Sequence, residues 1–560
     1  MYVVATAGHV DHGKSTLVHR LTGMWPDRLA EEQRRGLTID LGFAWAEIGG
    51  REIAFVDVPG HERFVGNMLA GIGPVPAVMF VVAATEGWMP QSDEHAAALR
   101  ALGVQHLLVV ISKADLTDPA SAIAQVRQQL PDATIVLGTD IDSVRSELVT
   151  LTDRLPAPDR DADVRLWVDR SFSVRGAGTV VTGTLAAGTI RVGDELVHDG
   201  RRVTVRGVQS LGREQTEVGA VARVAVNLRG VDYHSIARGD TVRTPDAWRD
   251  AGEIDVALRA AGKLHERLVL HIGSAAIPVH VRPLGEAGAR LKLARPLPLR
   301  VGDIGLLRDP GEHRIAAGIE VLDVAPPVLR RRGDARARAA QMATGQVRPP
   351  VCARSKDLRA MGFESSGERV GQWEVDPAWW AQRRELLTTA VQRWSAEHDL
   401  AAGMPAEELR RTLELPAIEL VAALAEGSGL EVIDGRLRRP GTALPDRVEK
   451  AVCTLEEWLA AEPFRAPDAD ELAELGLGPK ELAAAARAGR LVKIADGVVL
   501  GPDAYPRAAA TLATLAQPFT VAEAKRALGT TRRVAVPLLE ALDARGVTRR
   551  RPDGSRDLTR

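Results

Sequence analysis

Apolar runs alternate with helical patterns over residues 1–158 of the chain. Most of these runs are apolar at nearly every position, which is typical of strands that helices cover on both faces. The pattern therefore predicts an α/β domain with a mainly parallel sheet. The expected strands are Tyr2–Thr6, Ile53–Asp57, Ala77–Ala83, Leu107–Ser112 and Thr134–Leu137.

A different pattern begins near residue 161. Short β-branched segments recur between glycine-rich turns such as Gly176-Ala-Gly178, and helical periodicity is scarce. Short strands separated by turn residues are typical of small β-barrels. We therefore predict a first domain over residues 1–160 and two β-barrels over residues 161–250 and 251–327.

Beyond residue 327 the chain is rich in arginine and alanine, and its periodicity becomes helical. A unit of ~60 residues recurs, with helices followed by two short strands that turn at Asp-Gly, a pair suited to tight hairpins. Helices followed by such a wing form a winged helix. The repeat predicts a degenerate copy over 328–379 and complete copies over 380–441, 442–503 and 504–560.

Composition narrows the class of protein. The net charge is -2 over 560 residues, so a site for a polyanion has to be a local basic patch. The two cysteines, Cys352 and Cys453, provide neither a disulfide framework nor a metal-ligand spacing. The longest apolar stretch is shorter than the ~18 residues of a membrane span, and no secretion signal is recognisable, so we expect a cytoplasmic protein.

The segment from Gly8 to Ser15, GHVDHGKS, lies between an expected strand and a helix. It matches G-x-x-x-x-G-K-[ST], in which backbone amides surround phosphates, the lysine reaches the β- and γ-oxygens and the hydroxyl binds Mg²⁺. The motif predicts a nucleoside triphosphate site. The nucleotide-binding residues expected in this loop are Asp11, His12, Gly13, Lys14, Ser15 and Thr16.

A second motif, Asp57-Val-Pro-Gly60-His61, follows the second expected strand. A carboxylate there can hold Mg²⁺ through water, the Gly60 amide can bind the γ-phosphate, and His61 can orient the attacking water. Thr38, which lies between the two motifs, can bind Mg²⁺ while the γ-phosphate is present. We therefore predict that His61 is catalytic and that Ser15, Thr38 and Asp57 hold the metal.

The third motif, Ser112-Lys113-Ala-Asp115, ends the fourth expected strand. The Asp115 carboxylate can accept hydrogen bonds from N1 and the exocyclic amine of guanine, which adenine cannot offer. Lys113 would pack over the base. The motif predicts GTP rather than ATP, with Ser112, Lys113 and Asp115 at the base and Asp57 and Gly60 at the phosphates.

These motifs resemble those of the translational GTPases of the elongation factor Tu superfamily. Gly8–Ser15, Asp57–Phe64 and the barrel stretch Phe172–Gly183 correspond to its signatures, and the resemblance covers residues 1 to about 325. It implies hydrolysis of GTP to GDP and phosphate, stimulated by the ribosome, with His61 as the catalytic residue.

Within that superfamily the chain is most similar to the selenocysteine-specific elongation factors. Ser112 in place of Asn, the segment Arg35–Phe43 and the winged-helix array all match that branch, whereas Leu137-Gly138-Thr139 departs from the Ser-Ala that contacts guanine O6. The resemblance implies a monomer that uses GTP, GDP and Mg²⁺, contacts no membrane, and delivers selenocysteinyl-tRNA to the ribosome at recoded UGA codons.

The resemblance also places an aminoacyl pocket at Asp169, Arg170 and Arg223. A selenol is ionised at neutral pH, and two arginines attract a selenolate more strongly in a partly desolvated site than in water. Taken alone, Asp169 and Arg170 are also consistent with a surface ion pair.

The winged helices are implied to grip an mRNA hairpin, the selenocysteine insertion element. Basic residues outnumber acidic ones ten to four between Lys525 and Arg560, which makes a local basic patch, although a basic helix face is also typical of solvated surface. The RNA-binding residues expected are Lys525, Arg526, Arg532, Arg533, Arg549 and Arg550.

Two other functions remain open from the sequence. One is a translational GTPase for another tRNA or for initiation, against which the basic terminal winged helix argues. The other is a GTP-switched regulator whose winged helices bind DNA, against which the barrel signature Phe172–Gly183 argues.

Overall fold

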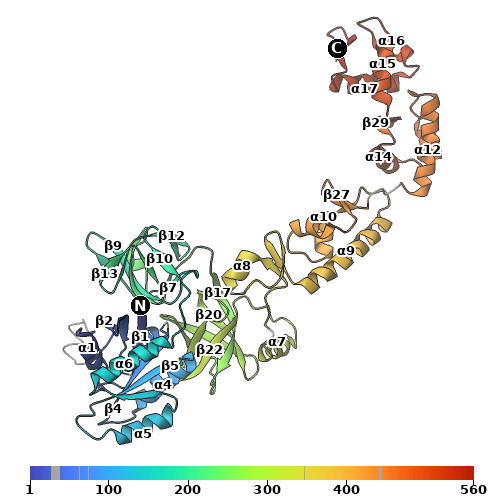
Figure 1. Ribbon diagram of the computed structural model, residues 1–560. Helices are drawn as coiled ribbons and strands as arrows, with labels where there is room; N and C mark the ends of the chain where they lie inside the picture. The colour runs from blue at the N-terminus through green and yellow to red at the C-terminus, as the bar shows by residue number, and fades with distance from the viewer. Residues whose placement is uncertain (27–37, 62–63, 74, 346, 440–443, 560) are drawn as a thin grey trace. The chain divides into compact units, whose positions relative to one another are not determined.

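The computed structural model describes residues 1–560 except 27–37, 62–63, 74, 346, 440–443 and 560. The chain forms two units, Met1–Ser365 and Ser366–Arg560, both drawn in Figure 1. The predicted fold class is confirmed: an α/β domain, β-barrels and winged helices follow one another along the chain. Within the described residues, no helix has the length and apolar character needed to cross a membrane.

The first domain is built on a sheet with the strand order β2-β3-β1-β4-β5-β6. Its strands are β1 (Tyr2–Ala7), β2 (Gly42–Ile48), β3 (Arg51–Asp57), β4 (Ala77–Ala83), β5 (His106–Ser112) and β6 (Thr134–Leu137). Every strand is parallel to its neighbours except β2, which pairs antiparallel with β3. The sequence pattern missed β2 because its residues alternate irregularly between buried and half-buried positions.

Helices cover both faces of this sheet (Figure 1). Their bounds are α1 (Lys14–Thr22), α3 (Val65–Ile72), α4 (Pro90–Leu102), α5 (Ala120–Gln129) and α6 (Ile141–Asp153). The core on one face contains side chains of α3, α4 and α5, and the core on the other face contains side chains of α1 and α6. This two-sided burial explains why β4 is buried at every position.

The first barrel has the strand order β7-β16-β11-β12-β15-β9-β8, with β13 paired to β12 and a separate ribbon of β10 and β14. These strands are β7 (Arg165–Trp167), β8 (Arg170–Val174), β9 (Gly178–Leu185), β10 (Thr189–Arg191), β11 (Glu195–His198), β12 (Arg201–Ser210), β13 (Arg213–Gln215), β14 (Glu217–Gly219), β15 (Ala222–Arg229) and β16 (Thr241–Arg243), with a short 3₁₀ helix, η2 (Tyr233–Ser235). Hairpin β8–β9 carries the signature noted in the sequence.

The second barrel closes in the order β17-β20-β19-β18-β21-β22. Its strands are β17 (Arg249–Arg259), β18 (Arg267–Ile272), β19 (Ala275–Pro283), β20 (Gly288–Leu299), β21 (Ile304–Asp309) and β22 (Arg314–Asp323). Helix α4 of the first domain lies directly on β22, since a Cβ added to Gly318 would meet the Ala101 carbonyl oxygen at 2.2 Å. Only glycine permits so close an approach of the two backbones.

Residues of the predicted degenerate winged helix pack partly against the second barrel. Helix α7 (Asp334–Ala343) is fastened through Arg338, and helix α8 (Ser355–Met361) places Leu358 and Met361 in the barrel's core. A strand, β23 (Cys352–Arg354), lies between them. In the second unit, β24 (Glu368–Val370) and β25 (Trp373–Val375) form an antiparallel hairpin near the end of this predicted copy.

Each later copy of the repeat folds as helices followed by a wing. The elements are α9 (Pro377–Glu397), β26 (Met404–Pro405), α10 (Ala406–Thr412), α11 (Glu419–Ala425), β27 (Glu431–Ile433) and β28 (Arg436–Arg438); then α12 (Asp446–Ala461), α13 (Ala469–Glu474), α14 (Pro479–Arg487), β29 (Val492–Ala495) and β30 (Val498–Leu500); then α15 (Ala504–Leu512), α16 (Val521–Ala527), α17 (Arg532–Ala544), β31 (Thr548–Arg550) and β32 (Arg556–Leu558). In the first of these wings Asp434 and Gly435 both have positive φ, as a two-residue hairpin turn requires.

The buried charge of Arg338 predicts how firmly α7 is held. Its Nε donates to Asp255 at 2.7 Å and its Nη2 to Asp323 at 2.5 Å. Arg338→Ala would leave buried carboxylates with fewer partners, at a cost of about 3 kcal/mol. We expect amide hydrogen exchange over residues 334–343 to accelerate ~100-fold. Arg336→Ala, at an exposed position of the same helix, should leave exchange unchanged; equal effects of both variants would contradict this role.

Candidate functional site

The phosphate-binding motif forms the loop between β1 and α1. Gly13 has a φ of 82° at the N-cap of α1, and Gly8 has a φ of 125° and packs so closely that an added Cβ would lie 2.2 Å from the Val81 carbonyl oxygen. The buried Lys14 side chain donates through Nζ to the carbonyl oxygens of Gly8 at 3.0 Å and His9 at 2.7 Å. Backbone amides, a helix N-terminus and a lysine therefore surround one position suited to phosphate.

Oxygen atoms from three elements gather beside this loop. The Ser15 hydroxyl donates to Asp57 Oδ2 at 2.6 Å and lies 3.0 Å from Thr38 Oγ1. Thr6, which the sequence did not single out, donates to Asp57 Oδ1 at 2.6 Å. Hydroxyl and carboxylate oxygens are the ligands that Mg²⁺ prefers, so the predicted metal residues Ser15, Thr38 and Asp57 fit that ion.

The second motif lies against the phosphate loop. A Cβ added to Gly60 would lie 2.4 Å from Lys14 Nζ and 2.6 Å from the backbone nitrogen of Val10, so only glycine fits there. The half-buried His61 follows directly, with its ring centroid 6.0 Å from that of Phe64. The intervening residues 62–63 of this motif lie outside the described part of the chain, as do residues 35–37 of the segment before Thr38.

The third motif is joined to the phosphate loop by Ser112. Its hydroxyl donates to the His12 carbonyl oxygen at 2.6 Å, so the serine fastens the two motifs to each other. Glu86, another residue missed from the sequence, lies 3.0 Å from Lys113 Nζ and 3.6 Å from His12 Nε2. Burial is the main reason that the pKa of His12 falls to about 4, so this histidine is neutral at physiological pH.

The loop after β6, where the sequence departs from the Ser-Ala pattern, is held by Arg20 of α1. Arg20 Nη1 donates to the Gly138 carbonyl oxygen at 2.7 Å. The Gly138 backbone nitrogen donates to Ile111 at 2.7 Å, which brings the loop beside the end of β5 and thus beside Ser112. Arg20 gave no signal in the sequence because an exposed helical arginine matches no motif.

Two side chains of helix α4 accept hydrogen bonds from the backbone of the phosphate loop. The backbone nitrogen of Gly8 donates to His95 Nδ1 at 3.0 Å, and that of Val10 donates to Gln91 Oε1 at 3.1 Å. Complete burial, with a smaller effect of the nearby Lys14 charge, lowers the pKa of His95 to about 3. His95 is therefore a neutral hydrogen-bond acceptor, a state that the loop geometry requires.

The predicted aminoacyl residues lie together where β8, β9 and β15 meet the first domain. Arg223 binds the buried Asp169 through both terminal nitrogens, with Nη2 to Oδ1 at 2.8 Å, and its guanidinium carbon lies 3.8 Å from the Phe43 ring centroid. Arg170 also faces Phe43, at 5.2 Å. The structure thus brings Asp169, Arg170 and Arg223 into one cluster.

Two further residues, Asp40 and Arg238, complete this cluster. Asp40 Oδ2 accepts from Arg170 Nε at 3.1 Å, and Oδ1 accepts from Arg238 Nη2 at 2.5 Å. Burial alone would raise the pKa of Asp40, but the hydrogen bond from Arg238 and the charges of both arginines hold it below its usual value. Asp40 lies within the segment Arg35–Phe43, and the sequence pattern predicts neither Asp40 nor Arg238 as a pocket residue.

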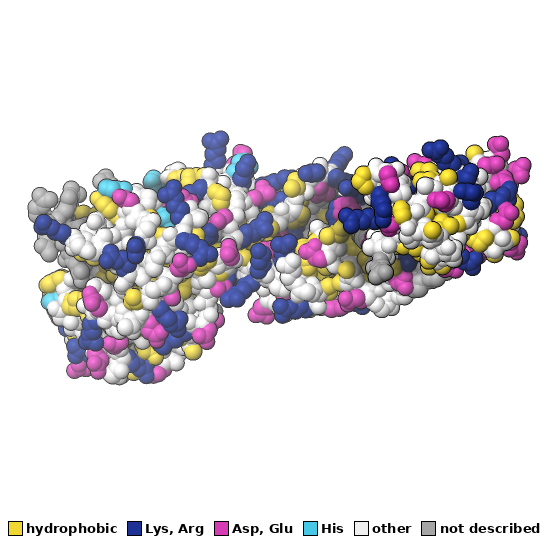
Figure 2. Space-filling model, turned by 90° about the horizontal axis from the view of Figure 1, so that it is seen from above, with side chains coloured by type: hydrophobic (Ala, Val, Ile, Leu, Met, Phe, Trp, Pro, Cys, Tyr) yellow, Lys and Arg dark blue, Asp and Glu magenta, His cyan; other side chains and the backbone are white. Residues whose placement is uncertain are grey.

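The basic residues of the last winged helix occupy three elements. Lys525 and Arg526 end α16, Arg532 and Arg533 begin α17, and Arg549 and Arg550 lie on β31. All are exposed, but Arg533 Nη2 donates to the carbonyl oxygens of Ala466 and Pro467, both at 2.8 Å. Arg533 therefore joins this winged helix to the preceding one, while the other five remain candidates for RNA. On the face drawn in Figure 2, basic and acidic side chains are interspersed.

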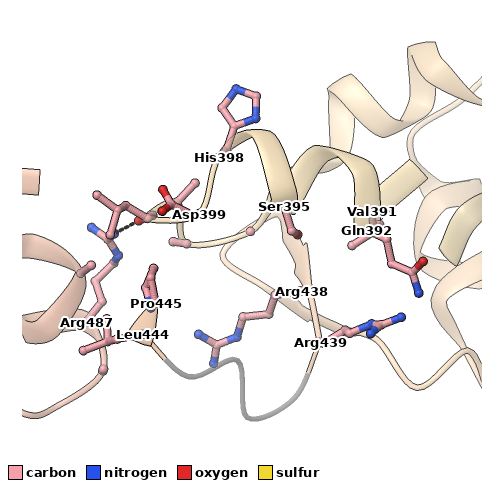
Figure 3. A pocket seen from close by; sticks show the side chains of 16 residues that line it. Val391, Gln392, Ser395, His398, Asp399, Arg438, Arg439, Leu444, Pro445 and Arg487 are labelled. Carbon is pink, nitrogen blue, oxygen red and sulfur yellow. Dashed lines mark hydrogen bonds between the residues drawn. The ribbon is translucent and has the colours of Figure 1, made fainter. Parts of the chain in front are cut away.

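A hollow of about 460 Å³ lies between the winged helices that precede and follow residues 440–443 (Figure 3). Arg438, Arg439 and Arg487 contribute basic groups and Asp399 an acidic one. Arg487 Nη2 donates to the Leu400 carbonyl oxygen at 2.7 Å, and Arg438 Nε lies 3.6 Å from Glu431. These two arginines of the hollow therefore already have partners within the unit.

Comparison with known proteins agrees with this geometry. The family "Elongation factor Tu GTP binding domain" matches residues 1–232, and "Elongation factor SelB, winged helix" matches residues 510–556. The selenocysteine-specific elongation factor of Escherichia coli (strain K12) is 31% identical over 98% of this chain and 97% of its own length. That of Desulfomicrobium baculatum is 34% identical over 59% and 57%. The crystal structure of a bacterial selenocysteine-specific elongation factor EF-Sec covers 100% of both chains with a TM-score of 0.76 at 24% identity, which shows the same fold.

The hydrogen bond of Ser112 predicts a measurable contribution to nucleotide binding. Ser112→Ala removes the donor to the His12 carbonyl oxygen, a loss of about 1 kcal/mol. We expect the Kd for guanine nucleotide, measured by fluorescent-nucleotide titration, to rise ~5-fold. Ser146→Ala removes a hydroxyl from an exposed position on α6 and should leave the Kd unchanged. An unchanged Kd in Ser112→Ala would show that the contact does not support the site.

The buried neutral state of His95 predicts a pH dependence of stability. The unfolded chain protonates this histidine near pH 6.5, whereas the folded protein does so only near pH 3, so stability falls as pH drops between these values. His95→Asn keeps an acceptor for Gly8 but does not titrate. Thermal unfolding of the first domain between pH 7 and pH 5 should therefore be less pH-dependent in His95→Asn. His106→Asn, at a half-buried position, serves as the control; equal pH profiles for wild type and His95→Asn would refute the assignment.

Proposed function

The chain belongs to the selenocysteine-specific elongation factors, GTP-hydrolysing translation factors, and we propose that it delivers selenocysteinyl-tRNA to the ribosome at recoded UGA codons while bound to an mRNA hairpin. The observation that carries this proposal is the cluster of Arg170 and Arg223 around Phe43, placed between the GTPase domain and the first barrel. A partly desolvated pair of arginines suits a selenolate far better than a neutral hydroxyl.

In this proposal the phosphate loop and α1 hold the triphosphate of GTP. Lys14 neutralises the β- and γ-oxygens, and the Gly60 amide, pressed against Lys14, donates to the γ-phosphate. Mg²⁺, held by Ser15, Thr38 and Asp57, would supply a positive charge to the phosphates. Asp11, His12, Gly13 and Thr16 form the rest of the phosphate loop.

Specificity for guanine follows from the third motif. Asp115 accepts from N1 and the exocyclic amine of the base, Lys113 covers one face of the base, and Ser112 fixes the motif to the phosphate loop. Lys113 is held in place by the Glu86 carboxylate 3.0 Å away. Arg20 keeps the adjoining loop at Gly138 close to this motif.

Hydrolysis requires a water aligned with the γ-phosphate. His61 follows Gly60 directly, and its side chain is proposed to orient that water. Ribosomal contacts would complete the alignment, so that hydrolysis follows codon recognition. The aminoacyl ester, held between the domain and the barrel, would then be released with the segment that carries Thr38.

The last winged helix is proposed to bind the mRNA hairpin. Lys525, Arg526, Arg532, Arg549 and Arg550 are exposed on its helices and wing and can contact phosphates and unstacked loop bases. Because Arg533 binds the last winged helix to the preceding one, RNA held by the last winged helix would also orient the preceding one. We further propose that the protein acts as a monomer in the cytoplasm.

The proposal predicts selective protection of an ester bond. With GTP, the protein should slow hydrolysis of selenocysteinyl-tRNA but not of seryl- or cysteinyl-tRNA, because only the selenol is fully ionised at neutral pH. Arg223→Ala should weaken protection ~10- to 100-fold through loss of a charged hydrogen-bonding group. Arg223→Lys keeps the charge and should retain part of the effect.

The matched control is Arg229→Ala, at an exposed position on the same strand, β15, which should protect like the wild type. Equal protection of all three aminoacyl-tRNAs would favour a translational GTPase for another tRNA. Absence of protection with tight binding to DNA would favour the GTP-switched regulator.

A further inference from the structure

We propose that Asp40 is a positioning residue for the aminoacyl pocket: it orients Arg170 and Arg238 only while Thr38 is held at the nucleotide. The inference rests on the proposed function and names a residue through which the nucleotide state acts on the pocket. It starts from the juxtaposition of one carboxylate of the first domain with two guanidinium groups of the first barrel.

The contacts of Asp40 are directional. One oxygen accepts from Arg170 Nε at 3.1 Å and the other from Arg238 Nη2 at 2.5 Å, so the carboxylate lies between the two side chains. Arg170 also donates to the Leu41 carbonyl oxygen. Arginine presents its donors in a planar fork, so these contacts fix the plane of the guanidinium group as well as its position.

The same short segment ends at the nucleotide. Thr38 Oγ1 lies 3.0 Å from the Ser15 hydroxyl, and two residues of extended chain span at most ~7 Å, so Thr38 cannot move far without displacing Asp40. Asn67 of α3, the helix after the second motif, donates to the Ile39 carbonyl oxygen at 2.9 Å and accepts from Arg238. Arg238 therefore contacts both segments that adjoin the γ-phosphate position.

The charges of the cluster point to an anionic ligand. Arg170, Arg223 and Arg238 face Asp40 and Asp169, which leaves a net charge of +1. The charge of Asp169 is paired with Arg223, whereas the Asp40 carboxylate accepts hydrogen bonds from both of the other two arginines. The side chains of Arg170 and Arg238 are 33% and 28% exposed, so a ligand can reach them, while that of Arg223 is 12% exposed.

These contacts determine what loss of Asp40 does. With Asp40 in place, Arg170 is oriented for the selenolate that the surplus charge attracts. When the γ-phosphate is lost and Thr38 is released, Asp40 leaves with it and Arg170 loses its orientation. The affinity for selenocysteinyl-tRNA is thereby tied to GTP, by a contact that lies outside the nucleotide site.

The test compares Asp40→Asn with the wild-type full-length protein. Two quantities are measured: the Kd for selenocysteinyl-tRNA by ester protection, with a non-hydrolysable GTP analogue and with GDP, and the Kd for each nucleotide. We expect the ratio of the GDP-state Kd to the GTP-state Kd to fall at least ~10-fold in Asp40→Asn, since a charge-assisted contact is lost only in the GTP state. The GDP affinity should stay within about twofold, whereas the affinity for the GTP analogue should fall, because the contact is made only in the GTP state.

Two further variants make the outcome specific. Asp132→Asn removes the same charge from an exposed turn of the same domain and should leave the ratio unchanged. In an Arg170→Gln background, Asp40→Asn should lower the ratio by less than it does in the wild type, because part of its action passes through Arg170. Additive effects of the two substitutions would contradict that route.

Each outcome separates the two proposals. If the wild type gives no GTP-dependent protection of selenocysteinyl-tRNA, the proposed function fails. If the wild type protects and Asp40→Asn keeps the full ratio, the role of Asp40 is wrong while the function stands. A large loss of GDP affinity in Asp40→Asn would place Asp40 in the nucleotide site and overturn the proposal as well.

Discussion

The buried carboxylate of Asp57 is the contact on which the functional part of the structure depends. It accepts hydrogen bonds from Thr6 on β1 and from Ser15 on α1, so the end of β3, its neighbouring strand and the phosphate loop share one anion. A buried charge is stable only if it has such partners or a metal. The same requirement places Ser15 where it also meets Thr38.

Polar side chains connect the segment that begins at Thr38 to the rest of the first unit. The segment from Thr38 to Leu41 meets α3 through Asn67 and the first barrel through Arg170 and Arg238. The arginines are the side chains that cross the junction, because a planar guanidinium can bind a carboxylate and a backbone carbonyl at once. Such pairs are not strong sources of stability, since burying them has a cost, but they fix orientation.

Arginine side chains also join separate structural elements far from the nucleotide site. Arg338 fastens α7 to the second barrel through Asp255 and Asp323, and Arg533 fastens the last winged helix to backbone carbonyls of the preceding one. In the terminal winged helix this divides the six predicted RNA-binding residues into one, Arg533, that joins neighbouring domains and five exposed ones that make no such contact to the preceding domain within the described part of the chain. A charge count along the sequence treats them all alike.

The sequence by itself determined the order of the domains, the main strands and the motif residues. Strands such as β4, buried on both faces, are apolar at every position, and the phosphate loop needs glycines at fixed spacing, so both leave a local pattern. The irregularly buried β2 left none. Only the tertiary structure decided which side chains support the site: Thr6, Arg20, Glu86 and His95 meet partners between 27 and 118 residues away. Local periodicity reports whether a segment is buried, whereas these partners are chosen by how the strands stack and where the chain returns, so a single arginine or histidine carries no sign of the contact it will make.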